Sequence, residues 1–359
     1  MVKNTNVINF KKSPYIIAEI GINHNGYLNL AKKMILESKK AGADAVKFQK
    51  RDANDLVNSL SQLGKSTGYL SKNENDINHN SKKFGTWVYP DLRLELTNKN
   101  YLALKKYCKK LKIDFIVTPW DETSANSLLK IGVDYFKIAS IDANNFHFCE
   151  FMAKKKKPTI ISTGMLTYNE ILKTQKIFKK YKTPHIFLHC TSAYPSDERD
   201  KNLRCIPKLR SLLNEDVGFS GHGVGIAGAT GATALGAGVI EKHVTLNKKM
   251  LGPDHAASLE FDTFKLMAET CRKVNISLGT SEKKFLKSEK TLHSILCRKF
   301  VVRKDIKKGA RLNKDNIKTA LTYSKGGLLP NQYYSLLNKK VKRTLYSGQV
   351  LKLSEITSK

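Results

Sequence analysis

Two histidines stand at the ends of two consecutive apolar stretches within GFSGHGVGIAGATGATALGAGVIEKHVTL. His222 follows the first stretch and His243 ends the second, with a run rich in glycine and alanine between them. If both stretches are parallel strands, the two imidazoles come from neighbouring strand ends and converge on one point. Imidazole nitrogens bind divalent ions, with oxygen donors or water completing the shell. The pair predicts a divalent metal site and leaves Mn²⁺, Mg²⁺ and Zn²⁺ open.

Two lysines interrupt stretches that are otherwise apolar: Lys47 in DAVKFQ and Lys137 in DYFKIA. A buried ammonium group is costly unless an anion pairs with it. Hydroxyls at the ends of nearby stretches would add hydrogen bonds to such an anion, and these come from Ser140, Ser162 and Ser220. The combination predicts a phosphate-binding site. For either lysine alone, pairing with a carboxylate in the core is the alternative.

Eight apolar, β-rich stretches alternate with helical periodicity over the first 280 residues. They are residues 15–20, 44–49, 113–118, 134–139, 158–163, 185–190, 216–221 and 238–243. Helical patterns lie between most of them and at about 260–277, and Gly42, Gly132 and Gly236 lie where helices should stop. The pattern predicts an α/β fold, a (β/α)8 TIM barrel, whose active site lies at the carboxyl ends of the strands.

Nearly every predicted strand delivers a polar or ionisable group to that one rim. Besides the residues above, they are Glu19, Asn23, His24, Gln49, Thr118, Asp142, His189, Thr191, Ser192 and Tyr194. A single strand-end serine or lysine is explained by a helix cap or a paired core charge. Polar groups at the ends of nearly all eight strands, taken together, favour a catalytic site.

The chain divides into a barrel domain over residues 1–280, a polar linker over 281–294 and a small domain over 295–359. In the small domain, one apolar and glycine pattern occurs twice: DIKKGARLNKDNI (305–317) recurs as TLYSGQVLKLSEI (344–356). The repeat predicts a compact domain with pseudo-twofold character.

A long polar insertion interrupts the barrel between Lys50 and Tyr89. It is rich in Asn, Ser and Lys and is too long for an ordinary loop. Such an insertion at the mouth of a barrel is typical of a lid or a binding loop.

Composition narrows the function classes. The chain is 41% hydrophobic. No apolar run approaches the roughly 18 residues of a membrane span, and no signal-peptide core is present. We therefore expect a cytoplasmic enzyme without a membrane partner. Six cysteines stand singly, which favours reduced thiols over disulfides or a cysteine zinc site. The net charge of +32 is spread along the chain without a nucleic-acid-binding motif, so it favours steering of anions and no nucleic-acid partner.

The chain resembles the sialic acid synthase family, whose members condense phosphoenolpyruvate with an N-acyl hexosamine. The matching stretches cover the barrel in the same order: AEIGINHNG, GADAVKFQK, KIASIDANNF, ISTGM, HCTSAYP, GFSGH, IEKHVTL and GPDHAASLE. The small domain resembles the antifreeze-like (SAF) domain of that family. The resemblance therefore implies a TIM barrel followed by a SAF domain.

The resemblance also implies a mechanism. His222 and His243 would hold the divalent metal, Mn²⁺ or Mg²⁺, which polarises the carbonyl of the open-chain sugar. C3 of phosphoenolpyruvate attacks that carbon, water adds at C2, and cleavage of the carbon–oxygen bond releases inorganic phosphate. The implied phosphoenolpyruvate ligands are Lys47, Thr118, Lys137, Ser140, Ser162 and Ser220.

Catalytic and sugar-binding roles follow from the same resemblance. Glu19 lies where the family has a carboxylate near the reacting carbon, and Asp142 lies where an acidic residue, Glu in many relatives, handles protons and the sugar. The implied catalytic set is Glu19, Lys47, Lys137 and Asp142, and the implied sugar contacts are Gln49, Lys50, Tyr194, Asp254 and Lys325.

The sequence leaves the identity of the sugar substrate open. Bacterial relatives that use N-acetylmannosamine carry an Arg in the SAF domain that reaches the neighbouring subunit's sugar, and here Leu321 stands about there. Lys50 and Lys325 could instead supply cations for a sugar 6-phosphate, as in the animal-type enzyme, or be solvated lysines. A diacetamido hexose of the legionaminic or pseudaminic type is a further alternative.

The family arrangement implies a domain-swapped homodimer, in which the SAF domain of one subunit covers the barrel mouth of the other. The polar connector at 279–294 is long enough for that reach. A carbohydrate-binding protein that has lost catalysis is the competing class, and the intact set of predicted catalytic and metal residues argues against it.

Overall fold

The computed structural model describes residues 13–52, 94–324 and 326–357. Nearly all of the predicted insertion and Lys325 lie outside the described residues. The chain forms two compact units, Met1–Gly279 and Thr280–Lys359, which are described separately below. Among the described residues, no helix combines the length and apolar character needed to cross a membrane.

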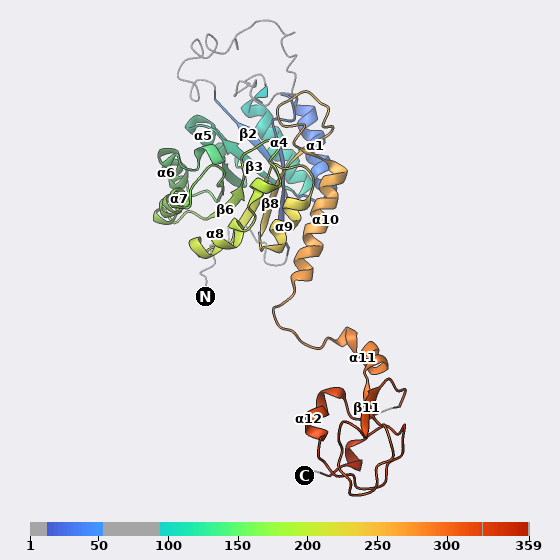
Figure 1. Cartoon of the computed structure of the whole chain (residues 1–359). Coiled ribbons are helices and arrows are strands. Elements are labelled where there is room, and N and C mark those ends of the chain that lie inside the picture. The colour runs from blue at the N-terminus through green and yellow to red at the C-terminus, as the bar shows by residue number, and fades with distance from the viewer. Residues whose placement is uncertain (1–12, 53–93, 325, 358–359) are drawn as a thin grey trace. The chain divides into compact units, whose positions relative to one another are not determined.

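In the described part of the first unit, eight parallel strands close into a barrel (Figure 1). They are β1 (Tyr15–Gly21), β2 (Ala45–Lys50), β3 (Asp114–Pro119), β4 (Tyr135–Ile138), β5 (Thr159–Ser162), β6 (His185–Cys190), β7 (Val217–Gly221) and β8 (Val239–Thr245). Strands adjacent in sequence are hydrogen-bonded, and β1 pairs with β8 to close the barrel. A short strand, β9 (Leu259–Glu260), pairs with β8. The predicted (β/α)8 barrel is confirmed, and each predicted strand agrees within two residues at either end.

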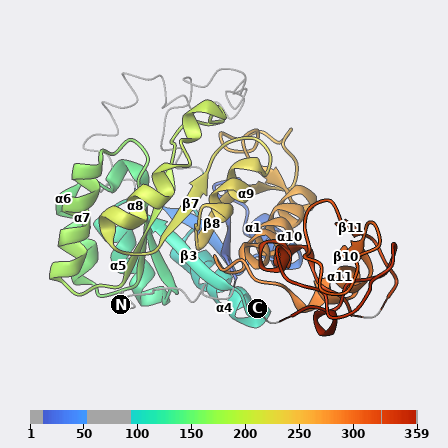
Figure 2. The same cartoon turned by 60° about the horizontal axis from the view of Figure 1, so that its bottom comes forward.

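Helices surround the strands (Figure 2). They are α1 (Leu28–Lys40), α4 (Asn98–Leu111), α5 (Glu122–Ile131), α6 (Phe146–Lys154), α7 (Tyr168–Lys180), α8 (Cys205–Leu213), α9 (Ala227–Ala234) and α10 (Phe261–Leu278), with 3-10 turns η3 (Ser140–Asp142) and η4 (Arg199–Lys201). Capping fixes several ends: Asp121 accepts a hydrogen bond from the backbone N–H of Ser124, and Thr167 forms a capping box with Glu170. Gly132 ends α5 with a φ of 80°, as predicted.

Strand alternation divides the side chains between two cores. Residues facing the helices form a large apolar cluster that includes Phe48, Phe115 and Phe136, all fully buried. Residues facing the barrel axis form a smaller cluster of Ile17, Ala45, Ile116, Ile160, Ile186, Leu188 and Val239. Two residues further along the same strands, the same inward face carries the polar positions, for example Glu19 after Ile17 and Lys47 after Ala45. The barrel interior is therefore apolar towards the amino ends of the strands and charged at their carboxyl ends.

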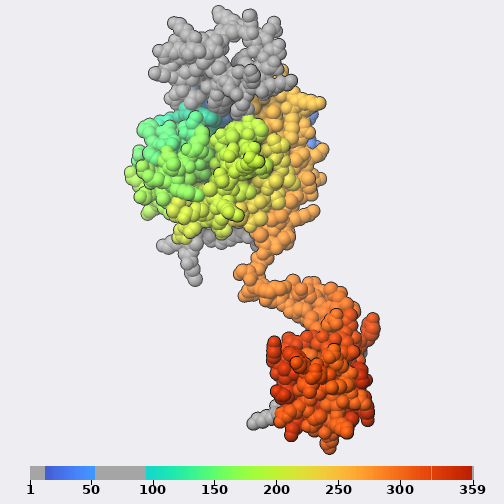
Figure 3. All heavy atoms as spheres, viewed as in Figure 1, coloured from blue at the N-terminus to red at the C-terminus, as the bar shows by residue number. Residues whose placement is uncertain are grey.

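The second unit is built from one continuous stretch of chain, the orange-to-red residues after Gly279 (Figure 3). It contains η5 (Lys287–Glu289), α11 (Lys290–Leu296), β10 (Lys299–Val302), β11 (Ile317–Ala320), η6 (Pro330–Gln332), α12 (Tyr333–Leu336) and η7 (Leu353–Glu355). The predicted linker over 281–294 thus includes η5 and most of α11. Strands β10 and β11 pair antiparallel.

The repeat in this unit corresponds to real structural symmetry. Ile306 and Leu345, which occupy the same place in the two copies, exchange both backbone hydrogen bonds. Gly309 donates to the carbonyl of Val341, and the equivalent Gly348 donates to the carbonyl of Val302. The apolar anchors of both copies lie in one core cluster. The predicted pseudo-twofold character is confirmed.

Candidate active site

A cavity of about 300 Å³ lies at the carboxyl ends of the barrel strands. Most of the predicted site residues line it: Glu19, Lys47, Gln49, Thr118, Lys137, Ser140, Ser162, Tyr194, Ser220, His222 and His243. They come from many strands because each parallel strand ends at the same rim. The remaining lining residues are Trp120, Ala139, Ile141, Met165, Ser192 and Glu241.

A buried network of charges forms one wall of this cavity. The Lys47 Nζ lies 2.9 Å from Glu19 Oε1 and 3.7 Å from Glu241 Oε1. The Lys137 Nζ lies 3.6 Å from Glu241 Oε1 and donates to Ser162 Oγ at 2.6 Å. Each of these four charged side chains is at most 5% exposed, so their mutual pairing offsets the cost of burial.

The two lysines differ in their response to burial. Burial alone would lower the pKa of Lys47, but the carboxylates of Glu19 and Glu241 outweigh it and raise that pKa. Burial lowers the pKa of Lys137, which has Glu241 as its main carboxylate partner and Lys47 as a repelling neighbour. Each lysine is therefore paired with a buried carboxylate, which was the alternative for either lysine alone. Both lysines also line the cavity.

Glu241 is a site residue that the motif analysis missed. Its side chain accepts a hydrogen bond from Ser220 Oγ at 3.0 Å, and it lies between both lysines. Although burial opposes it, the nearby Lys137 and Lys47 ammonium groups hold its pKa below the usual range. The sequence indicates its position, because Glu241 stands two residues before His243 and therefore lies on the same face of the strand.

The two histidines come together as predicted. Their ring centroids lie 5.4 Å apart, and the ring of Tyr194 lies 4.1 Å from that of His222. His222 Nδ1 lies 3.1 Å from the backbone oxygen of Thr191. A carbonyl oxygen only accepts, so Nδ1 donates to it, and Nε2 is the nitrogen that a metal would use.

His243 is held neutral. Burial keeps its pKa well below the usual range, and the neighbouring His222 adds to this effect. Its Nδ1 is buried without a hydrogen-bond partner among the described residues, and Asp254 Oδ2 lies 3.7 Å away. Neutral imidazole is the form that binds metals. The described residues contain no group of three or more His, Cys, Asp or Glu side chains placed to hold an ion, so any metal held by the two histidines would need ligands besides these side chains.

A second set of contacts orients Gln49. Its Nε2 donates to Glu19 Oε1 at 2.8 Å, and its Oε1 accepts from Arg51 Nη2 at 2.5 Å. Arg51 is in turn fixed by Glu95, whose Oε1 lies 2.7 Å from Nη1, and by the ring of Trp120 at 4.7 Å. Sequence patterns did not indicate Arg51, Glu95 or Trp120.

Asp254 lies beside the cavity without lining it. A Cβ atom placed on Gly21 would meet Glu19 Oε1 at 3.2 Å and Asp254 Oδ2 at 3.5 Å, so these two carboxylates approach the same point. Burial raises the pKa of Asp254 to about 6, and the charge of Glu19 adds to the rise.

Besides Asp254, two more members of the predicted catalytic and sugar-binding set do not line the cavity. On η3, Ser140 and Ile141 line the cavity, whereas Asp142 does not. Burial raises the pKa of Asp142 to about 6, although a hydrogen bond with Asn145 acts in the opposite direction. Lys50 follows Gln49 on β2 and points to the opposite side of the strand, where its Nζ lies 5.2 Å from the ring centre of Tyr101 on α4. The predicted sugar contact of Lys325 lies outside the described residues.

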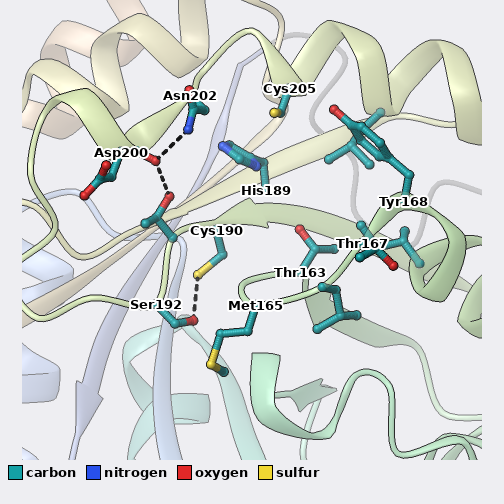
Figure 4. Close-up of a pocket in the computed structure, with 14 residues that line it drawn as sticks. Thr163, Met165, Thr167, Tyr168, His189, Cys190, Ser192, Asp200, Asn202 and Cys205 are labelled. Atoms are coloured by element: carbon teal, nitrogen blue, oxygen red, sulfur yellow. Dashed lines mark hydrogen bonds between the residues drawn. The ribbon is translucent and has the colours of Figure 1, made fainter.

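A second cavity, of about 570 Å³, shares Met165 and Ser192 with the first (Figure 4). It lies between the loops that follow β5 and β6 and the first turns of α7 and α8. The rim residues His189 and Thr191, which the strand pattern had placed at the end of β6, line this cavity. Thr191 Oγ1 and Asn202 Nδ2 both donate to the backbone oxygen of Asp200 (Figure 4).

Comparison with known proteins agrees with this geometry. The NeuB family model matches residues 34–283, and the SAF domain model matches residues 298–357. The N-acetylneuraminate-9-phosphate synthase of Homo sapiens is 36% identical over 328 residues, which cover 91% of this chain and 88% of the human protein. The N,N'-diacetyllegionaminic acid synthase of Legionella pneumophila is 34% identical over 342 residues, which cover 94% of this chain and 93% of that protein.

A solved structure is similar as well. The crystal structure of an N-acetylneuraminic acid synthetase from Leptospira borgpetersenii in complex with citrate has a TM-score of 0.65 and 34% identity, and covers 78% of this chain and 90% of that one. The predicted resemblance to sialic acid synthases is confirmed. The chain belongs to the NeuB family and carries a C-terminal SAF domain.

Proposed function

We propose that the protein condenses phosphoenolpyruvate with the open-chain form of an N-acyl hexosamine, giving a nonulosonic acid of the sialic acid type and inorganic phosphate. It is then a carbon–carbon bond-forming transferase. One observation carries the proposal: the cavity at the barrel mouth brings two buried ammonium groups and several hydroxyls beside two converging imidazoles. An anionic substrate and a metal-bound carbonyl can therefore meet in one place.

The ammonium groups and hydroxyls suit the phosphate and carboxylate of phosphoenolpyruvate. Lys137 carries three N–H donors and gives one to Ser162, and Lys47 donates to Thr118 Oγ1 at 3.3 Å. Both lysines line the cavity, and so do Ser140 and Ser220. Charge-assisted hydrogen bonds of this kind bind phosphate strongly.

His222 and His243 would hold the divalent metal, Mn²⁺ or Mg²⁺. Such an ion supplies Lewis-acid polarisation of the sugar carbonyl. With two protein nitrogens as ligands, its other ligands would come from water and from oxygens of the sugar. The neutral state of His243 favours binding at neutral pH.

Glu19 is the residue we assign to proton transfer. Its Oε1 is occupied by Lys47 and Gln49, whereas its Oε2 is buried without a hydrogen-bond partner among the described residues. That oxygen is available to accept the proton of the water that adds at C2 of phosphoenolpyruvate. Gln49 and Tyr194 line the same cavity and would bind sugar hydroxyls.

The sugar itself is the finer part of the proposal. The product named for the human relative carries a phosphate, and the product named for the Legionella relative carries two acetyl groups. N-acetylmannosamine, its 6-phosphate and a diacetamido hexose are therefore the substrates to compare. We further propose a cytoplasmic homodimer in which SAF domains are exchanged; light scattering on the full chain tests the dimer through its mass.

Incubation in ¹⁸O-labelled water tests the proposed chemistry. If water adds at C2 and the carbon–oxygen bond breaks, mass spectrometry will find the label at C2 of the new sugar acid and not in the released phosphate. Label in the phosphate would show that the phosphorus–oxygen bond breaks and would contradict the proposal.

A further inference from the structure

Lys242 is a buried lysine that does not line the catalytic cavity. It stands on β8 between Glu241 and His243, and because side chains alternate along a strand, it faces the helices instead of the barrel axis. Its neighbours on that outer face, Ile240 and Val244, are fully buried members of the larger apolar core. Lys242 itself is 3% exposed, so its ammonium group lies within an apolar layer.

The ammonium group of Lys242 has no carboxylate partner. Among the described residues, no carboxylate lies within ion-pair distance of its Nζ, which donates to the backbone oxygen of Gly223. Lys201, which is also buried, differs because it forms an ion pair with Glu198. Burial of a charge without an opposite charge beside it is costly. The bond to Gly223 is the one hydrogen bond of the described residues that offsets this cost.

Two glycines leave room for the lysine side chains. Gly221 lies beside Lys242 in the paired register of β7 and β8, and a Cβ atom on Gly221 would meet Lys242 Cδ at 3.3 Å. A Cβ atom on Gly223 would meet Lys201 Nζ at 2.6 Å and Ser196 Oγ at 3.1 Å. Side chains from β8 and from the loop after β6 therefore both reach the backbone on either side of His222.

Two further contacts, both from the loop after β6, hold His222. The Ser196 N–H donates to the backbone oxygen of His222 at 3.3 Å, and His222 Nδ1 donates to the backbone oxygen of Thr191 at 3.1 Å. Neither contact involves β8, and the paired register of β7 with β8 ends at Gly221 and Lys242. The bond from Lys242 therefore continues the connection between the two strands past the point where the pairing stops.

We propose that Lys242 is a positioning residue for metal binding. By holding the carbonyl of Gly223, it fixes the segment that carries His222 to the strand that carries His243, and so it sets the separation of the two imidazoles. Their ring centroids lie 5.4 Å apart. This inference rests on the metal site of the proposed function and adds to it a residue that lies outside the cavity.

The Mn²⁺ affinity of Lys242→Met tests the inference. Methionine fills the apolar layer without a charge, so the variant should fold and should melt at the wild-type temperature or above it. Electron paramagnetic resonance titration of the full chain should show a Kd for Mn²⁺ raised about tenfold or more, the usual effect of losing an outer contact of a metal site. An unchanged Kd, or loss of the folded circular dichroism spectrum, would overturn the inference.

Lys105→Met is the matched control. Lys105 is a partly buried lysine of the same barrel, and its Nζ lies 2.6 Å from Asp134 Oδ1 at the amino end of β4. Because this pair lies at the opposite end of the strands, the Kd for Mn²⁺ should change less than about twofold even if the melting temperature falls. An equal rise of the Kd in both variants would show a general loss of stability and would overturn the positioning role.

Hydrogen exchange gives a readout that needs no metal. In metal-free Lys242→Met, the Ser196 N–H, whose acceptor is the His222 carbonyl, should exchange about threefold faster or more than in the wild type. The Thr163 N–H, which donates to the Leu188 carbonyl in the same barrel, should exchange at an unchanged rate. Equal rates for Ser196 in both proteins would overturn the inference.

The two possible failures are distinguishable. If the wild type itself does not bind Mn²⁺, the metal site of the proposed function is wrong, and the inference is overturned with it. If the wild type binds Mn²⁺ and Lys242→Met binds it equally well, the proposed function stands and only the role of Lys242 is overturned.

Discussion

Arg51 donates from Nη2 to Gln49 Oε1 at 2.5 Å, and this bond decides which end of the Gln49 amide faces Glu19. The amide nitrogen must point to the Glu19 carboxylate, where it donates at 2.8 Å. Arg51 is itself 4% exposed and is fixed by Glu95. Arg51 is therefore a positioning residue for Gln49, the proposed sugar contact.

Replacement of this arginine should affect sugar binding more than turnover. Arg51→Met removes the bond that orients Gln49, and a hydrogen bond to a charged group contributes about 1.5–3 kcal/mol. We expect the KM for the sugar to rise about tenfold, with the KM for phosphoenolpyruvate changed less than twofold. Arg343→Met is the control, since Arg343 pairs with Glu355 in the other unit. Equal changes in both KM values would contradict the positioning role.

Removal of the Glu241 charge should lower the free energy of unfolding, because two buried ammonium groups then lack this carboxylate partner. Glu241→Gln leaves Lys137 without its main carboxylate partner, and breaking a buried pair costs about 3–5 kcal/mol. Urea unfolding should show a loss of that order. Phosphoenolpyruvate, an anion that supplies the missing charge, should raise the melting temperature more in the variant than in the wild type.

The matched control is Glu150→Gln. Glu150 forms ion pairs with Lys154 and Lys180 on the surface of the same barrel. Its replacement should leave the unfolding curve and the phosphoenolpyruvate effect unchanged, because exposed pairs are screened by solvent. A Glu241→Gln protein as stable as the wild type would show that the lysines lose their charge on burial.

Metal binding should depend on both predicted ligands. His222→Ala and His243→Ala should each remove tight Mn²⁺ binding, measured by electron paramagnetic resonance, and should abolish metal-dependent phosphate release. The circular dichroism spectrum should stay that of the folded barrel. His147→Ala is the control, because its side chain is 88% exposed. Full Mn²⁺ binding by either site variant would remove that histidine from the site.

Asp142 should make stability depend on pH. Burial raises its pKa from 3.8 to about 6, so between these values the unfolded chain loses a proton that the folded chain keeps. The free energy of unfolding therefore falls as pH rises from about 4 to 6, and the penalty is complete above 6. Asp142→Asn should be more stable than the wild type at pH 7, by about 1–2 kcal/mol after discount for solvent exposure, and this gain should shrink towards pH 4. A gain that does not change with pH would contradict the assignment.

Much of the barrel could be predicted because its signals are local. A strand pattern of period two also fixes which residues face the axis, and this is why Lys47, Lys137, His222 and His243 were found together. The same rule places Glu241 on this face, two residues before His243. The repeat in the SAF unit was equally local, since each copy carries its own glycine and apolar anchors.

The remaining features depend on contacts between distant segments. Arg51 and Glu95 are 44 residues apart, so no spacing rule joins them. The second cavity combines residues of two motifs of the sequence, ISTGM and HCTSAYP, with residues of α7 and α8, and no spacing rule joins these segments. Lys50 shows the limit of the resemblance: similarity to the animal-type enzyme suggested a sugar contact, whereas alternation along β2 turns this side chain towards Tyr101.

The most direct test of the central proposal is phosphate release from phosphoenolpyruvate by the purified full chain with Mn²⁺ or Mg²⁺. It is run with each of the three sugars, without sugar, and with EDTA. The account predicts release that needs both a hexosamine and the metal, together with a product whose mass equals that of the sugar plus pyruvate. Release without sugar, release that EDTA leaves unchanged, or no release with any of the sugars would contradict it.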